Sequence, residues 1–236
     1  MTKVGILVHC RHLETISWED LVFGIPEQDK LGDLSTLVRV LLSLEPSEQL
    51  ASIVIGCGPS RKDGLSEGEY TKQFLLDNFD RLHEFARLQP LMANLTDEQL
   101  HGLRATFEAI TVTHEIKNTV AEIETAAGIF AEKQVQKVVQ ICAASHASRC
   151  IKEQAVARSH SMIDKSQLWQ TVTTEVCYDG TTPEDVCVIE PLHRRDQPMT
   201  FVRPGLSEVM VPYFFLPDDD KKEFVKIVES FMAARK

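Results

Sequence analysis

Short apolar runs that alternate with helical stripes of apolar residues are the feature that most constrains the fold of this chain. Three runs are too short for helices and are mostly apolar, as expected of strands buried on both faces; they cover residues 4–8, 53–55 and 138–142. Between them, apolar side chains recur at helical spacing, as in 34–42 and 120–130. Strands and helices in alternation predict an α/β three-layer sandwich, with a mostly parallel sheet and helices on both faces.

Further elements follow from smaller signals. Residues 109–113, the β-branched run 171–176 and residues 186–189 are interpreted as additional strands, and residues 82–107 as a helical insertion. Helix starts are predicted from capping side chains at Ser66, Thr96, Asn118 and Ser145. A last amphipathic helix follows Pro217, with this apolar stripe predicted to be buried: Phe224, Val225, Ile227, Val228 and Phe231. We expect a single domain over 1–236, with a divergent C-terminal part from 158 to 236.

The composition excludes several function classes. Of the 236 residues, 35 are acidic and 25 basic, which gives a net charge of −10 and disfavours binding to nucleic acid or to an anionic membrane. No stretch approaches the roughly 20 apolar residues that span a bilayer, and the apolar run at the start is too short for a signal peptide. We therefore expect a cytoplasmic protein. Six cysteines without a Cys-x-x-Cys pair are interpreted as free thiols.

Polar residues that directly follow the predicted strands define a candidate site, because ligands of open parallel sheets bind beyond the carboxyl ends of the strands. These residues comprise His9, Cys10, Arg11 and His12 after the first strand, Gly56, Cys57, Gly58, Arg61 and Lys62 after the second, His114, Glu115, Asn118 and Thr119 after the third, and Ser145, His146 and Arg149 after the fourth. Glycine N–H groups, helix N-termini and arginines together predict an anion site. Taken singly, the glycine loop is equally typical of a tight turn, and the capping residues of ordinary helix ends.

Three segments are similar to the YdcF-like family of SanA, ElyC and YdcF proteins. They are Ile53–Gly58 followed by Gly64-Leu65-Ser66-Glu67, then Asn118-Thr119 with Glu122 nearby, and then His146-Ala147-Ser148-Arg149. In order and spacing they resemble the family's Gly-Gly loop with its Ser-Glu helix start, its Asn-Thr-x-Glu-Asn segment and its His-x-x-Arg-Ala segment, and they span about residues 4 to 157. The resemblance implies a Rossmann-like fold with a pocket for a nucleotide-like or S-adenosylmethionine-like ligand.

The chain departs from this pattern at several positions. His9-Cys10 stands where the family has a glycine, Ile116 replaces a common serine, and Cys142-Ala143 replaces a Thr-Ser pair. The last alanine of the third segment is Cys150, and the glutamate of the second is displaced by one position. The resemblance therefore supports the fold more firmly than the identity of the ligand or reaction.

Three hypotheses for function follow. The first is an enzyme acting on a phosphorylated or nucleotide-like small molecule. In this hypothesis His146 is the general acid or base, and Glu115 or Glu67 orients it. The groups expected to bind the ligand are His9, the 56–58 loop, Arg61 or Lys62, Ser66, Asn118, Thr119, Ser145 and Arg149. The second is a metal-dependent hydrolase using His9, His12, His114, Glu115 and His146, although no dedicated metal spacing is present.

The third hypothesis is a non-catalytic binding or regulatory module that uses the same pocket or the 82–107 helices. The apolar stripe from Phe74 to Leu88 is interpreted as core or as the contact of a homodimer. Cys10 and Cys57 are interpreted as inert thiols, since no recognised motif places a histidine beside them.

Overall fold

The computed structural model describes residues 1–114, 116, 118–178, 186–188, 200–202 and 217–233. The chain divides into two compact units, Met1–Pro183 and Glu184–Lys236, and each is described by itself. The prediction of a single domain over the whole chain stays a prediction. None of the described helices is long and apolar enough to cross a membrane.

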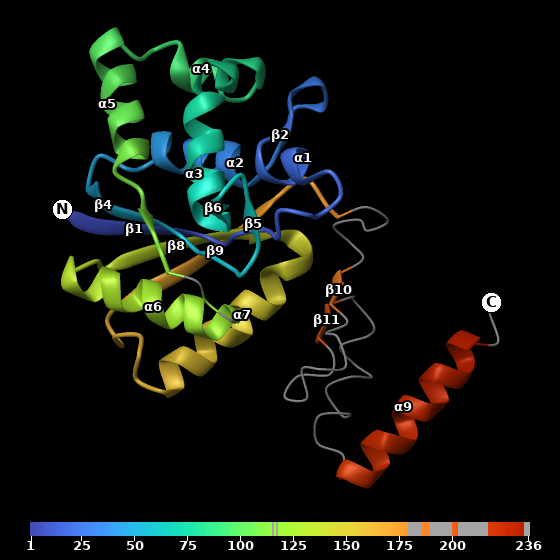
Figure 1. The fold of residues 1–236 in the computed structure, drawn as a ribbon. Helices are drawn as coiled ribbons and strands as arrows, with labels where there is room; N and C mark the ends of the chain where they lie inside the picture. Colours follow the sequence, from blue (N-terminus) through green and yellow to red (C-terminus); the bar gives the residue numbers. More distant parts are fainter. Residues whose placement is uncertain (115, 117, 179–185, 189–199, 203–216, 234–236) are drawn as a thin grey trace. The chain divides into compact units, whose positions relative to one another are not determined.

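A parallel sheet with the order β7-β4-β1-β8-β9 forms the centre of the first unit (Figure 1). Its strands are β1 (Thr2–Val8), β4 (Glu48–Ile55), β7 (Thr111–Val112), β8 (Lys137–Ala143) and β9 (Leu168–Thr174). All four neighbouring pairs are parallel, and β1 runs between β4 and β8, with Val8 opposite Ile55 on one side and Ile141 on the other. The α/β Rossmann-like sandwich predicted from the alternating runs is therefore confirmed.

Helices cover both faces of this sheet. Helices α2 (Asp33–Leu42) and α3 (Glu67–Asp77) lie on one face, and α6 (Thr119–Glu132) and α7 (Ala144–Ser159) lie on the other (Figure 1). Because successive strand side chains point to opposite faces, Ile6 and Ile55 join the core under α2, whereas Leu7 and Val54 pack with Phe130 of α6. The sheet is thus apolar on both faces, as a doubly covered parallel sheet requires.

The helical insertion between β4 and β7 comprises η2 (Phe79–Glu84), α4 (Gln89–Met92) and α5 (Asp97–Glu108). Leu82, Phe85 and Leu88 are fully buried and join the α2-side core, so the apolar stripe is core as expected. The predicted caps Ser66 and Thr96 are present at the starts of α3 and α5, and each forms a capping box.

Several small elements were not predicted. The segment between β1 and α2 contains α1 (Trp18–Val22), the hairpin β2 (Gly24–Ile25) and β3 (Lys30–Leu31), and the turn η1 (Pro26–Gln28). A second hairpin, β5 (Arg61–Lys62) with β6 (Leu65–Ser66), follows β4. Two-residue strands carry no measurable periodicity, which explains why the sequence pattern missed them.

The second unit contains the antiparallel pair β10 (Val186–Val188) and β11 (Thr200–Val202), and the helix α9 (Asp218–Ala233). The predicted helix after Pro217 is therefore confirmed. The prediction that its apolar stripe is buried was wrong for the described residues: Ile227 is 62% exposed, and Phe224, Val225 and Val228 are half-buried. Ile189, the last residue of the predicted 186–189 strand, lies outside the described residues.

Candidate functional site

The carboxyl ends of four strands form one continuous edge, and the backbone ladder extends one residue beyond three of them. His9 N–H donates to the carbonyl of Ile141, Gly56 N–H to that of Val8, and Thr113 N–H to that of Ile55. His9, Gly56 and Thr113, which follow three different strands, are therefore held in register with one another. The expectation that the strand ends bring distant segments together is confirmed for His9, Gly56 and the start of α6.

His9 and Glu122 form a buried ion pair at this edge. Nδ1 of His9 lies 2.6 Å from Oε2 of Glu122, and the two side chains are only 2% and 12% exposed. On the other side of the ring, Nε2 lies 3.4 Å from Oε1 of Gln140. Burial alone would lower the pKa of His9, but the charge and hydrogen bond of Glu122, with smaller contributions from Cys142 and Gln140, raise it to about 9. His9 is therefore an imidazolium that donates from both nitrogens.

His146 lies next to this pair, in the first turn of α7. Its Nε2 is 3.4 Å from Oγ1 of Thr119, and its ring centroid is 5.9 Å from that of His9 with an interplanar angle of 62°. The side chain is half-buried, whereas Thr119 is buried. Two helix starts, those of α6 and α7, thus converge on one imidazole.

The glycine loop after β4 is filled by carboxylates of the protein itself. Glu67 accepts the N–H of Gly58 at 2.6 Å and that of Ser60 at 3.1 Å, and it also accepts the hydroxyl of Ser60. A Cβ atom built on Gly56 would lie 1.4 Å from Oε1 of Glu122. Glu67 therefore takes the N–H of Gly58, one of the loop donors that we expected to hold an anion, and the close approach of the two carboxylates explains the glycines without a ligand.

Cys10 and Cys57 are not poised as nucleophiles. The Cys10 thiol donates to the carbonyl of Gly56, and burial, with the nearby charges of Glu122 and Glu67, raises the pKa of Cys10 well above its ordinary value. Cys57 is buried and directs its thiol at the carbonyl of Gly58. These contacts agree with inert thiols.

The structure corrects the predicted role of Ser145 as a helix cap. Helix α7 begins directly after β8 with Ala143 at the N-cap position, so Ser145 lies inside the first turn. Asn118, by contrast, caps α6 as predicted, with its side-chain oxygen accepting the N–H of Ala121 at 2.9 Å.

The remaining predicted ligand groups are dispersed. Ser66 caps α3, and Arg61 lies exposed in the β5–β6 hairpin, where Lys62 places its ammonium 4.8 Å from the centre of the Tyr70 ring. Arg149 is half-buried in α7, one turn after His146. Glu115, the second predicted catalytic residue, lies outside the described residues.

Sequence reasoning from the residues alone missed two polar groups of the site, Gln140 in β8 and Glu122 in α6. Gln140 is fully buried in β8, where its Nε2 donates to Thr171 at 2.7 Å and to Gln154 at 3.2 Å while Oε1 faces His9. The signal was present, since Gln140 is a lone amide inside the apolar run 138–142. Glu122 appeared only through the family resemblance, and no pattern in the sequence connects it with His9.

A second buried ion pair stabilises the start of the loop after β1. Nε and Nη2 of Arg11 each donate to Asp33 at 2.7 Å, and Nη1 donates to the hydroxyl of Tyr178 at 3.0 Å. Although burial alone would lower it, the Asp33 charge and hydrogen bonds raise the pKa of Arg11 above its ordinary value. Arg11 therefore links the loop after β1 to Asp33, the first residue of α2, and this contact stabilises the fold.

Metal-ligand geometry is not seen in the described part of the chain. Among those residues, no group of three or more histidine, cysteine, aspartate or glutamate side chains is arranged to hold an ion. His12 and His114, two of the ligands considered from the sequence, are both exposed.

Comparison of the chain with family models, with curated proteins and with solved structures gives no match in any of the three. The similarity to the YdcF-like family accordingly stays a prediction from the sequence motifs.

Proposed function

We propose that this protein is an enzyme that binds a small anionic molecule, phosphorylated or nucleotide-like, at the carboxyl edge of the sheet, with His146 as the acid or base. The observation that carries the proposal is the meeting of His146 with Thr119 and with the His9–Glu122 pair. An imidazole exchanges protons near neutral pH, and here it stands beside a fixed charged pair at the ligand-binding edge of an α/β sheet.

The start of α7 is the best place for the anion. Its N-cap residue, Ala143, makes no side-chain hydrogen bond, and no acidic residue stands in the first turn. Uncapped N–H groups and the positive end of a 16-residue helix both favour a negative ligand. Arg149 follows His146 by three positions and so shares its side of the helix, which supports a charge-assisted contact with the same ligand.

This proposal differs from the expectation that the 56–58 loop binds the anion. Since Glu67 already accepts from Gly58 and Ser60, the loop acts as a rigid support for Glu67 and Glu122. A second candidate is a binding module without catalysis, because a fold alone does not establish turnover. In that case a ligand stabilises the fold and no turnover is found.

The proposal is tested by a thermal-shift and calorimetric screen against ADP, UDP-glucose, glucose 6-phosphate and S-adenosylmethionine. We expect a phosphorylated compound to stabilise the fold, and Arg149→Ala to weaken its affinity by about ten- to a hundred-fold, which is the value of one charge-assisted contact. His146→Gln is expected to keep most of the affinity and to lose turnover of that compound.

Lys152→Ala is the matched control, because Lys152 is exposed on the same helix. We expect its affinity to equal that of the wild type. An Arg149→Ala variant that folds and binds the phosphorylated compound with unchanged affinity would contradict the proposed anion site. Unchanged turnover in His146→Gln would contradict the assigned acid or base.

A further inference from the structure

A hollow of about 540 Å³ lies in the helical insertion, between η2, α4 and α5. Its lining includes Phe79, Met92 and Leu100 as apolar groups and Asp80, His83 and Gln89 as polar ones. This volume falls within the roughly 300–1,000 Å³ of small-molecule sites, and an apolar lining with few polar groups is typical of them. All three elements lie on the α2 side of the sheet (Figure 1), and the hollow shares no lining residue with the His9–His146 site.

The floor and rim of this hollow are held in place by contacts of their own. Phe79 is 7% exposed, its ring packs edge-on against Phe107 at 6.0 Å, and the guanidinium of Arg104 lies 5.6 Å from the ring centre. At the rim, the amide of Gln89 donates to the carbonyl of His83 at 3.0 Å. Because these groups are fixed in the protein alone, a ligand would enter a preformed site at little cost in ordering.

The lining of the hollow carries one carboxylate. Asp80 is the acidic lining residue and is exposed at its edge. Residues 81–108 contain no lysine. Their three arginines each pair with an acidic side chain: Arg81 with Glu84, Arg87 with Asp29 and Glu175, and Arg104 with Glu108. The guanidinium of Arg104 also lies against the ring of Phe79, so its charge is shared between the floor of the hollow and Glu108. No lysine or arginine is therefore among the lining residues, and His83 is the one basic side chain of the lining.

From this lining and charge, we propose that the hollow binds a small molecule with an aromatic or aliphatic body and a protonated amine. The body packs against Phe79, Met92 and Leu100, and the amine pairs with Asp80, while His83 and Gln89 offer further polar contacts at the rim. The site is independent of the anion site proposed above, so each can fail without the other.

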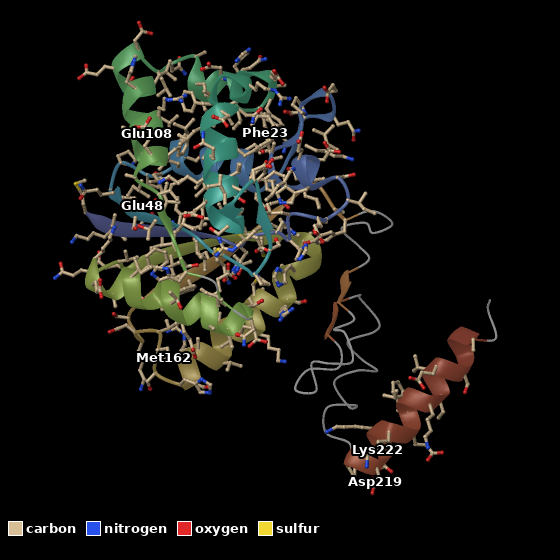
Figure 2. All side chains as sticks on the ribbon, viewed as in Figure 1. Phe23, Glu48, Glu108, Met162, Asp219 and Lys222 are labelled. Carbon is tan, nitrogen blue, oxygen red and sulfur yellow. The ribbon has the colours of Figure 1, made fainter. Side chains whose placement is uncertain are left out.

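The test uses three probes of one shape, namely 1-naphthylmethylamine, 1-naphthalenemethanol and 1-naphthoic acid. The full chain is labelled with ¹³C at the methionine methyl groups, and the signal of Met92 is assigned with Met92→Leu. Met162 is 49% exposed and lies on the far side of the sheet from Glu108 of α5 (Figure 2), so its methyl signal reports non-specific binding. We expect the amine to shift the Met92 signal saturably, the alcohol to bind more weakly and the acid to bind weakest.

Asp80→Asn keeps the shape of the side chain and removes its charge. For an exposed ion pair we expect the affinity of the amine to fall by about two- to five-fold and that of the alcohol to stay the same. Glu98→Gln is the matched control, since Glu98 is exposed at the start of α5 and does not line the hollow. The proposal is overturned if the Met92 signal does not move, if Met162 responds equally, or if the acid binds as well as the amine.

Discussion

Replacing Glu122 by glutamine removes the carboxylate that keeps His9 charged, and the consequence for stability depends on pH in a defined way. A histidine whose folded pKa lies above its unfolded value holds its proton more tightly in the folded state. Its contribution to stability is therefore fully present below the unfolded pKa of 6.5 and is lost as the pH rises through the folded pKa of about 9. The window of loss runs from pH 6.5 to 9.

The size of this contribution follows from the two pKa values. It is about 3 kcal/mol at pH 6 to 7, falls to about 1 kcal/mol at pH 8 and is close to zero at pH 10. In the Glu122→Gln variant, burial no longer has an opposing charge, so His9 becomes neutral. We expect the variant to lose about 2–3 kcal/mol of unfolding free energy near pH 7 and little at pH 10.

The assay is a double-mutant cycle with Glu122→Gln and His9→Gln, measured by urea unfolding at pH 6, 7, 8, 9 and 10. Both tryptophans of the chain, Trp18 and Trp169, are buried in the first unit, so their fluorescence reports its unfolding. The cycle cancels the titration of all other groups and leaves the coupling between the two side chains.

The matched control is Glu124→Gln on the same helix. Glu124 is 26% exposed and pairs at 3.4 Å with His160, which is itself 60% exposed, so we expect a loss below about 0.5 kcal/mol at every pH. A coupling energy between His9 and Glu122 that is the same at pH 6 and pH 10 would refute the assignment of His9 as an imidazolium. So would a proton NMR titration in which the His9 ring titrates below pH 7.

Two further changes probe the frame of the site. Gly56→Ala places a methyl group against the Glu122 carboxylate. We expect chemical denaturation to show that the free energy of unfolding falls by about 1–3 kcal/mol. An unchanged free energy of unfolding would show that Glu122 moves freely. Asp33→Asn leaves Arg11 as a buried charge with a weakened partner. We expect the free energy of unfolding, measured in the same way, to fall by about 3–5 kcal/mol. A fall of less than about 1 kcal/mol would show that the pair is not buried in solution.

The fold was predictable because buried parallel strands leave a strong trace in the sequence. The run 4–8 lies within β1, 53–55 closes β4, and 138–142 lies within β8. The caps at Ser66 and Asn118 were also predictable, because a side chain that accepts a helix N–H acts locally. Ser145 was wrongly assigned as a cap because the end of β8 fixes where α7 begins, and that is a tertiary constraint.

The site was only partly predictable, for a related reason. Position after a strand correctly placed His9, Gly56 and His146 at one edge, since parallel strands end together. Which charges then meet depends on partners far apart in the chain: His9 and Glu122 are separated by 113 positions. No periodicity or spacing relates such residues, so the approach of Glu122 to His9 and Gly56 could not be inferred from the sequence.

The central place of β1 in the sheet has a consequence for how the protein is made. During synthesis, β1 emerges first, and its neighbour β4 follows about 50 residues later, but β8 completes the other side only after residue 143. Until then, one edge of the central strand is open and His9 has neither Gln140 nor the sheet that buries it. Such non-local pairing slows folding and leaves a nascent strand edge exposed to other chains. Synthesis halted between β4 and β8 would therefore yield a chain that depends on chaperones to stay out of aggregates.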